Sequence, residues 1–210
     1  MLHKDPFIIS PRTFDLIKEL QSMSALADFH LVGGTALGLQ LGHRNSVDID
    51  LFSQHDFEDQ YIIDSINKKH DFFERFRRNN TIIGFIDNIK VDFITHAYPF
   101  VKEPIKEEGI TFLSKEDISA MKLNAIAGSG QRLKDFIDIY FLLESFSVND
   151  MLEYYAIKYP NSNPLIALKS VSYFDDIDPS IDPPQMRNPL SIDKIKRRIT
   201  EAVLHPYKTF

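Results

Sequence analysis

Two acidic residues at alternate positions of an apolar segment could do chemistry in this chain. Asp48 and Asp50 are interleaved with Ile49 and Leu51. Side chains on a strand alternate between its two faces, so both carboxylates would point to one face and the apolar residues to the other. Carboxylates are typical ligands of Mg²⁺, together with the phosphates of a bound substrate. The spacing therefore indicates magnesium-assisted chemistry on a phosphate-bearing molecule.

A pair of glycines upstream could bind the phosphates. Gly33 and Gly34 follow a strand-like run and precede Thr35, where a helical pattern opens. The free amides at the start of a helix attract anions. The alternative is a tight strand-to-helix turn that binds nothing. Arg44 and Ser46, in the loop before the acidic pair, either help to hold phosphate or only cap that loop.

A third carboxylate would complete a metal site. Asp92 stands among apolar residues in a predicted strand. If that strand lies beside the acidic pair, Asp48, Asp50 and Asp92 converge and can bind metal. Two magnesium ions can activate an attacking hydroxyl and hold a leaving pyrophosphate, and Asp92 is the best-placed base for the hydroxyl. Hydroxyl attack on an α-phosphate is nucleotidyl transfer. The alternative is a solvated strand end, and the interpretation fails if Asp92 lies on the far side of the sheet.

Composition bounds the class of protein. The chain has 210 residues, 43% of them hydrophobic, and no cysteine, so it can bury a core and forms no disulfide. The N-terminus lacks a signal-peptide core and no run approaches the ~18 apolar residues of a membrane helix, so we expect a soluble cytoplasmic protein. The net charge of −6 argues against general coating by nucleic acid. Basic clusters at 75–78 and 194–198 are either a local groove or solvated faces.

The first half of the chain must position these residues, and it alternates helical and strand-like patterns. Helices are expected at 11–29, 35–41 and 57–69, and strands at 29–32, 48–52, 72–77, 81–86 and 90–94. The turn signal Asp87-Asn88 predicts that the last two strands form a hairpin.

The second half reads as helical. Ser114 and Asp117 mark a helix start, and two helices run from there to Phe146 with a break at 128–130. Further helices are expected at 148–158, 164–171 and 192–204, with an extended proline-rich loop at 175–189. We therefore predict an α+β protein with a mixed αβ domain at 1–113 and a helical domain at 114–210.

These motifs together resemble a known family. The DNA polymerase beta superfamily of nucleotidyltransferases is similar in Gly33-Gly34-Thr35, Arg44-x-Ser46-x-Asp48-x-Asp50 and Asp92. More narrowly, the AbiEii/AbiGii abortive-infection toxin family is similar in Lys122-Leu123-Asn124-Ala125, in Arg132-x-Lys134-Asp135-x-x-Asp138, and in the segments 167–170 and 173–176. The resemblance covers about residues 29–200.

The resemblance implies a fold and an activity. The fold would be the minimal nucleotidyltransferase mixed sheet with flanking helices, followed by a helical half that completes the nucleotide site. The protein would be a Mg²⁺-dependent toxin of an abortive-infection phage-defence system. It would transfer NMP from an NTP to an acceptor hydroxyl on transfer RNA or protein. Its partner would be a cognate antitoxin, usually a DNA-binding winged-helix protein, and no membrane would be involved.

The resemblance also assigns residues in the helical half. Lys122, near a helix start, would neutralise the triphosphate as a point charge, and Asp138 would face the nucleotide. Arg132, Lys134 and Asp135 would contribute to nucleotide binding beside them. The alternative is that Lys134 and Asp138 form an ordinary helix ion pair, worth only ~0.3–0.5 kcal/mol.

Two functions of other classes remain open. One is a nucleotide-binding partner protein without catalysis, which would bind nucleotide and transfer no label. The other is a phosphotransferase that moves a γ-phosphate to protein, which labelling at the α- or γ-phosphate would distinguish.

Overall fold

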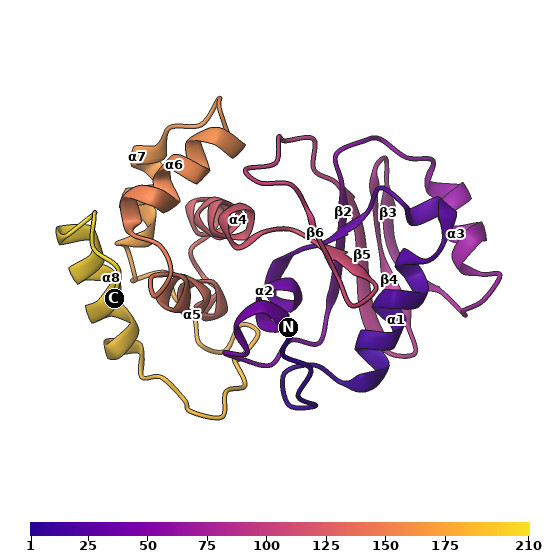
Figure 1. The fold of residues 1–210 in the computed structure, drawn as a ribbon, viewed down its shortest axis with the longest axis horizontal. Coiled ribbons are helices and arrows are strands. Elements are labelled where there is room, and N and C mark those ends of the chain that lie inside the picture. The colour runs from indigo at the N-terminus through magenta and orange to yellow at the C-terminus, as the bar shows by residue number, and fades with distance from the viewer. The chain divides into compact units, whose positions relative to one another are not determined.

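The chain folds into two compact units. The computed structural model describes residues 1–210. The first unit comprises Met1–Tyr98 and Glu103–Leu113, and the second comprises Pro99–Lys102 and Ser114–Phe210 (Figure 1). None of the eight α-helices has the length and apolar character needed to cross a lipid bilayer.

A seven-stranded mixed sheet forms the centre of the first unit. Its strands are β1 (His30–Leu31), β2 (Ile49–Ser53), β3 (Phe73–Arg78), β4 (Thr81–Ile86), β5 (Ile89–Thr95), β6 (Ile105–Glu107) and β7 (Ile110–Phe112). The spatial order is β3-β4-β5-β2-β1-β7-β6. The pairs β2–β5 and β1–β7 are parallel, and the other neighbours are antiparallel. The predicted α+β class with a mixed sheet is confirmed.

Helices flank this sheet on both sides. They are α1 (Pro11–Gln21), the 3-10 turn η1 (Ser24–Leu26), α2 (Gly33–Leu41) and α3 (Asp59–Ile66). Figure 1 shows α1 and α3 on one side of the sheet and α2 on the other. The face toward α1 and α3 is apolar, because Leu51, Phe93 and Ile82 are fully buried neighbours across β2, β5 and β4.

The first helix is shorter than the predicted 11–29. It ends at Gln21, because the hydroxyl of Ser22 donates to the Glu19 carbonyl and Met23 adopts an extended conformation. Serine side chains compete in this way for backbone groups that a continuing helix would use.

The sheet contains one hairpin that the sequence analysis missed. Strands β6 and β7 pair antiparallel across Glu108 and Gly109, which have φ values of +51° and +85°. Strands of three residues are too short to show an alternating pattern. The predicted hairpin of β4 and β5 is confirmed, with Asp87 and Asn88 at positive φ.

The second unit is helical. Its helices are α4 (Lys115–Gly128), α5 (Leu133–Leu142), α6 (Val148–Lys158), α7 (Pro164–Val171) and α8 (Ile192–Leu204). Ser114, Ser147 and Ser191 begin α4, α6 and α8, and each accepts a backbone N–H from the first turn. The predicted break between α4 and α5 is confirmed, with Gly130 at φ +65°.

A buried polar network attaches Pro99–Lys102 to the helical unit. The Asp117 carboxylate accepts the backbone N–H groups of Val101 at 2.9 Å and Lys102 at 3.0 Å. The Lys158 ammonium lies 2.8 Å from Asp117 and donates to the Pro99 carbonyl at 3.2 Å. Both charged side chains are almost fully buried, so each needs the other as its partner.

Candidate active site

The sheet brings two of the three predicted acids together. In the parallel pair β2–β5, Asp50 and Asp92 are register partners. Register partners project from the same face of a sheet, so the two carboxylates are neighbours on the face opposite Leu51 and Phe93. Asp48 lies in the segment just before β2. Because Asp92 is the register partner of Asp50, it does not lie on the far face of the sheet, which would have excluded a shared site.

Gly33 allows a carboxylate to approach the start of α2. Its φ is +67°, and a Cβ atom on it would lie 2.5 Å from Asp50 Oδ2. Both the conformation and the space therefore require glycine. The helix starts at Gly33, two residues before the predicted start, and Val32 provides no side-chain cap. The first amides of α2 thus form an anion-attracting end beside Asp50.

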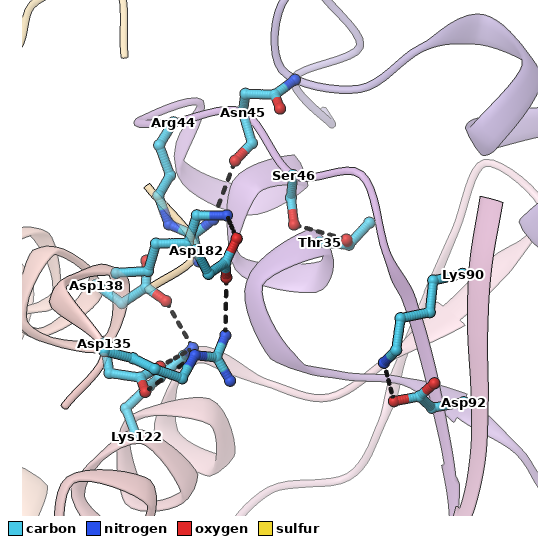
Figure 2. A network of polar contacts seen from close by, with 12 residues as sticks. Thr35, Arg44, Asn45, Ser46, Lys90, Asp92, Lys122, Asp135, Asp138 and Asp182 are labelled. Carbon is cyan, nitrogen blue, oxygen red and sulfur yellow. Dashed lines mark hydrogen bonds and ion pairs between the residues drawn. The ribbon is translucent and has the colours of Figure 1, made fainter. Parts of the chain in front are cut away.

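Gly34 allows the loop after α2 to fold back. A Cβ atom on Gly34 would lie 2.5 Å from Arg44 Nη2 and 3.2 Å from Ser46 Oγ. Arg44 is 2% exposed and donates to the Asn45 carbonyl at 3.0 Å (Figure 2). Both predicted loop residues therefore lie at the start of α2, and they also order the loop itself.

Thr35 ties the helix to the acidic segment. Its hydroxyl lies 2.9 Å from Ser46 Oγ and also within hydrogen-bonding range of the Asp48 carbonyl. Figure 2 shows the Thr35–Ser46 contact. The hydroxyl thus positions the segment that leads to Asp50, and phosphate contact by Thr35 stays a prediction.

Lys90 also lies on this face, although it is not among the predicted site residues. Its ammonium lies 2.5 Å from Asp92 Oδ2. Figure 2 draws this ion pair as a dashed line. Their spacing of two residues on a predicted strand would have revealed a shared face. The other oxygen, Asp92 Oδ1, is buried and accepts no hydrogen bond. Such an orphaned acceptor is costly, and a bound cation would remove that cost.

The candidate site suits a divalent cation by the type of its donor atoms. No three His, Asp or Glu side chains converge in this structure in a way that would hold a metal ion. The available donors are carboxylate oxygens, which Mg²⁺ prefers, and they include the orphaned Asp92 Oδ1 beside its register partner Asp50. These residues therefore suit a magnesium ion in donor type.

In the helical unit, three of the predicted residues form one buried ion cluster. The ammonium of Lys122 lies 2.7 Å from Asp135 Oδ1 and 2.7 Å from Asp138 Oδ2 (Figure 2). Lys122 lies in the middle of α4, not near its start as expected, and the two acids lie on α5. The cluster therefore joins α4 to α5. Contact of Lys122 with a triphosphate stays a prediction.

The two remaining basic residues pair with an acid from the proline-rich loop. Lys134 forms an ion pair with Asp182, and Arg132 Nη2 lies 3.5 Å from the same carboxylate. The alternative of a helix ion pair between Lys134 and Asp138 is therefore wrong. The loop offered no periodic pattern that could have identified Asp182 as the partner.

Comparison with known proteins agrees with the predicted family. Residues 20–203 match the family of the nucleotidyl transferase AbiEii toxin of type IV toxin–antitoxin systems. The uncharacterized protein aq_aa25 of Aquifex aeolicus (strain VF5) is 33% identical over 168 residues, which cover 77% of this chain and 81% of that protein.

Two solved structures share the fold across nearly the whole chain. JHP933 from Helicobacter pylori is 16% identical with a TM-score of 0.55, and the match covers 94% of this chain and 93% of that one. An antigenic nucleotidyltransferase-like protein from Paracoccidioides brasiliensis is 14% identical with a TM-score of 0.53, and the match covers 96% of both chains. With the family match over residues 20–203, the chain belongs to the AbiEii family of nucleotidyl transferase toxins and is an enzyme of the nucleotidyltransferase class.

Proposed function

We propose that this protein transfers a nucleoside monophosphate from a nucleoside triphosphate to an acceptor hydroxyl and releases pyrophosphate. The pairing of Asp50 with Asp92 on one sheet face, with Asp50 against Gly33 at the start of α2, carries this proposal. Asp50 and Asp92 would hold Mg²⁺, with Asp48 as the further ligand that the sequence predicts. The bound metal would neutralise phosphate charge and polarise the reacting oxygens.

Each of the other steps has a residue assigned to it. Asp92 accepts the proton of the acceptor hydroxyl while the oxygen of that hydroxyl bonds to the α-phosphorus. The bond from that phosphorus to the bridging oxygen breaks, and pyrophosphate leaves with the electron pair. The amides of Gly33 and Gly34 bind phosphate oxygens at the positive end of α2, and Arg44 adds a fixed positive charge.

The helical unit and the partners complete the proposal. We assign Lys122 and Asp138 to nucleotide binding, with Asp135 holding Lys122 in place, and we keep Arg132 and Lys134 as further nucleotide-binding residues. The AbiEii family is described as a type IV toxin–antitoxin system, which implies an antitoxin partner. We propose a DNA-binding winged-helix antitoxin, a cytoplasmic location, and transfer RNA or protein as the acceptor.

A labelling experiment tests the activity. The protein is incubated with magnesium, each α-labelled nucleotide in turn, and total cellular RNA or protein. We expect label in one acceptor class, and a drop of at least 100-fold in Asp50→Asn and Asp92→Asn. Asp64→Asn is the matched control, because Asp64 is an exposed acid on α3 whose carboxylate accepts a hydrogen bond from Gln60.

The other outcomes are distinct. Label transferred from the γ-phosphate alone would identify a phosphotransferase. Nucleotide binding without label in any acceptor would identify a non-catalytic binding protein. Normal transfer by Asp50→Asn, with the fold checked by circular dichroism, would show that the metal assignment is wrong.

A further inference from the structure

The sheet face that carries the acids continues to the edge of the sheet. Register partners run from Asp92 on β5 to Ile83 on β4 and then to Phe76 on β3. The row on one side runs from Lys90 through Phe85 to Phe73, and the row on the other side runs from Ile94 through Thr81 to Arg78. Since register partners share a face, Phe73, Phe76 and Arg78 face the same way as Asp92. We name these three residues the β3 aromatic face.

This surface is open. All six residues of β3 are exposed, and the exposed fractions of Phe73 and Phe76 are 67% and 48%. Two exposed aromatic rings and an arginine lie on this one face, and the row through Phe76 leads to Asp92. An exposed apolar surface of this kind is typical of a binding site. Strands are spaced by about 4.8 Å, so Phe76 lies about 10 Å from Asp92.

We propose that the β3 aromatic face binds an unpaired polynucleotide strand, and that the hydroxyl at the end of this strand is the acceptor. Bases of any sequence stack on exposed aromatic rings, and arginine pairs with the phosphates between them. The proposal deepens the proposed function and rests on it. A base near the end of the strand lies on Phe76 while the terminal hydroxyl reaches Asp92.

Charge supports a polyanion as the occupant. The chain carries a net charge of −6, yet Arg78 lies on the β3 aromatic face, whereas Glu74, the one acid of β3, faces the other way as the register partner of Gly84. This local excess of positive charge attracts phosphates although the whole protein repels them.

The backbone of β3 argues against a partner protein's strand as the occupant. Added strands need a regular row of free N–H and C=O groups along the edge. The register of β3 shifts between Glu74 and Phe76, which places a bulge at Arg75. Bulges and edge charges are devices by which proteins prevent strand addition.

The opposite face of β3 supplies a matched control. Arg77 is the register partner of the buried Ile82, so it faces away from the acids. It donates to Gln60 on α3 at 2.8 Å and lies 3.4 Å from Glu74. Arg77 and Arg78 therefore carry the same charge on one strand but face opposite ways.

The experiment measures binding separately from catalysis. Fluorescence anisotropy follows a short labelled oligouridylate with the full-length protein, without nucleotide or metal. We expect Phe76→Ala to weaken binding about tenfold. We expect Arg78→Ala to reduce the slope of log affinity against log salt by about 0.7, and Arg77→Ala to leave that slope unchanged. Because all three residues are exposed, the melting temperatures should stay close to that of the wild type.

A matching oligothymidylate separates the two nucleic acids. Binding of the oligouridylate alone supports an acceptor with ribose. Equal binding of the two oligonucleotides, with the same loss of affinity in Phe76→Ala, supports recognition of the unpaired strand. Wild-type binding by Phe76→Ala and Arg78→Ala would overturn the proposal, as would an equal loss in Arg77→Ala. A Phe76→Ala variant that loses only a complex with a partner protein would overturn it as well.

The surface and the proposed function can fail separately. If the wild type transfers no label but its oligouridylate binding depends on Phe76, the transfer activity is wrong and the surface stands. If label is transferred and Phe76→Ala changes neither binding nor the KM for the oligonucleotide acceptor, the surface alone is wrong.

Discussion

The backbone of a single residue, Gly33, places a carboxylate against a helix end. Its positive φ is strained for any other residue, and the room for its missing Cβ is taken by Asp50 Oδ2 at 2.5 Å. Gly130 shares the positive φ of +65°, but the nearest atom to a Cβ there is a carbonyl oxygen at 3.5 Å. A substitution at either glycine would strain the backbone, but only one at Gly33 would also displace an acid of the candidate site.

This difference predicts the effect of two alanine substitutions. Gly33→Ala and Gly130→Ala should each lower the free energy of unfolding by about 1–2 kcal/mol, measured by urea denaturation. Only Gly33→Ala should also lower nucleotide transfer, by about 100-fold, because it displaces Asp50. Equal transfer by the two variants would contradict the placement of Asp50.

His30 on β1 gives the stability a dependence on pH. Burial lowers the pKa of His30 below its usual 6.5, and the negative charge of Asp28 opposes this in part. Between the lowered pKa and 6.5 the unfolded chain binds a proton that the folded chain does not. Stability should therefore fall as the pH drops through this window and level off below the folded pKa.

Urea denaturation between pH 7.5 and 5 measures this effect. The free energy of unfolding of His30→Asn should change less over this range than that of the wild type. An unchanged profile in His30→Asn would assign the pH dependence to other groups.

Connections between elements depend on buried charges in the helical unit. Lys158 on α6 and Asp117 on α4 hold the segment Pro99–Lys102 through an ion pair and backbone hydrogen bonds. Their side chains are 1% and 0% exposed, so removing one partner leaves an uncompensated buried charge.

This burial predicts a large loss of stability for one substitution. Lys158→Met should lower the free energy of unfolding by about 3–5 kcal/mol in urea denaturation. Arg12→Met is the surface control, because Arg12 pairs with Asp87 where both side chains are exposed by 42% and 55%. It should cost less than about 1 kcal/mol. Similar losses in the two variants would show that Lys158 is not held as described.

Ligand binding should be visible in the stability of the whole molecule. A ligand that binds only the folded chain stabilises it by about 2.7 kcal/mol at a hundredfold excess over its Kd. Magnesium and nucleoside triphosphate together should therefore raise the melting temperature of the wild type, and removal of metal with EDTA should reverse the rise. Asp92→Asn should respond much less, and an equal rise in this variant would remove Asp92 from the binding site.

Local patterns were sufficient to predict most elements. The turn residues Asp87 and Asn88 predicted the β4–β5 hairpin, and Gly128–Gly130 predicted the break between α4 and α5. The β6–β7 hairpin was missed because its strands have three residues each. The end of α1 was misplaced because the apolar period continues past Ser22, where hydrogen bonds, not hydrophobicity, stop the helix.

The sequence by itself determined the residue types that can bind metal and phosphate, the alternation of Asp48 and Asp50, and the family. These depend on neighbouring residues, whose spacing is visible in the chain. Only the tertiary structure decided that Asp92 is the register partner of Asp50, that Lys134 pairs with Asp182, and that Pro99–Lys102 packs in the helical unit. Strand order and long-range ion pairs join distant residues, and no local periodicity encodes which strands or charges will meet.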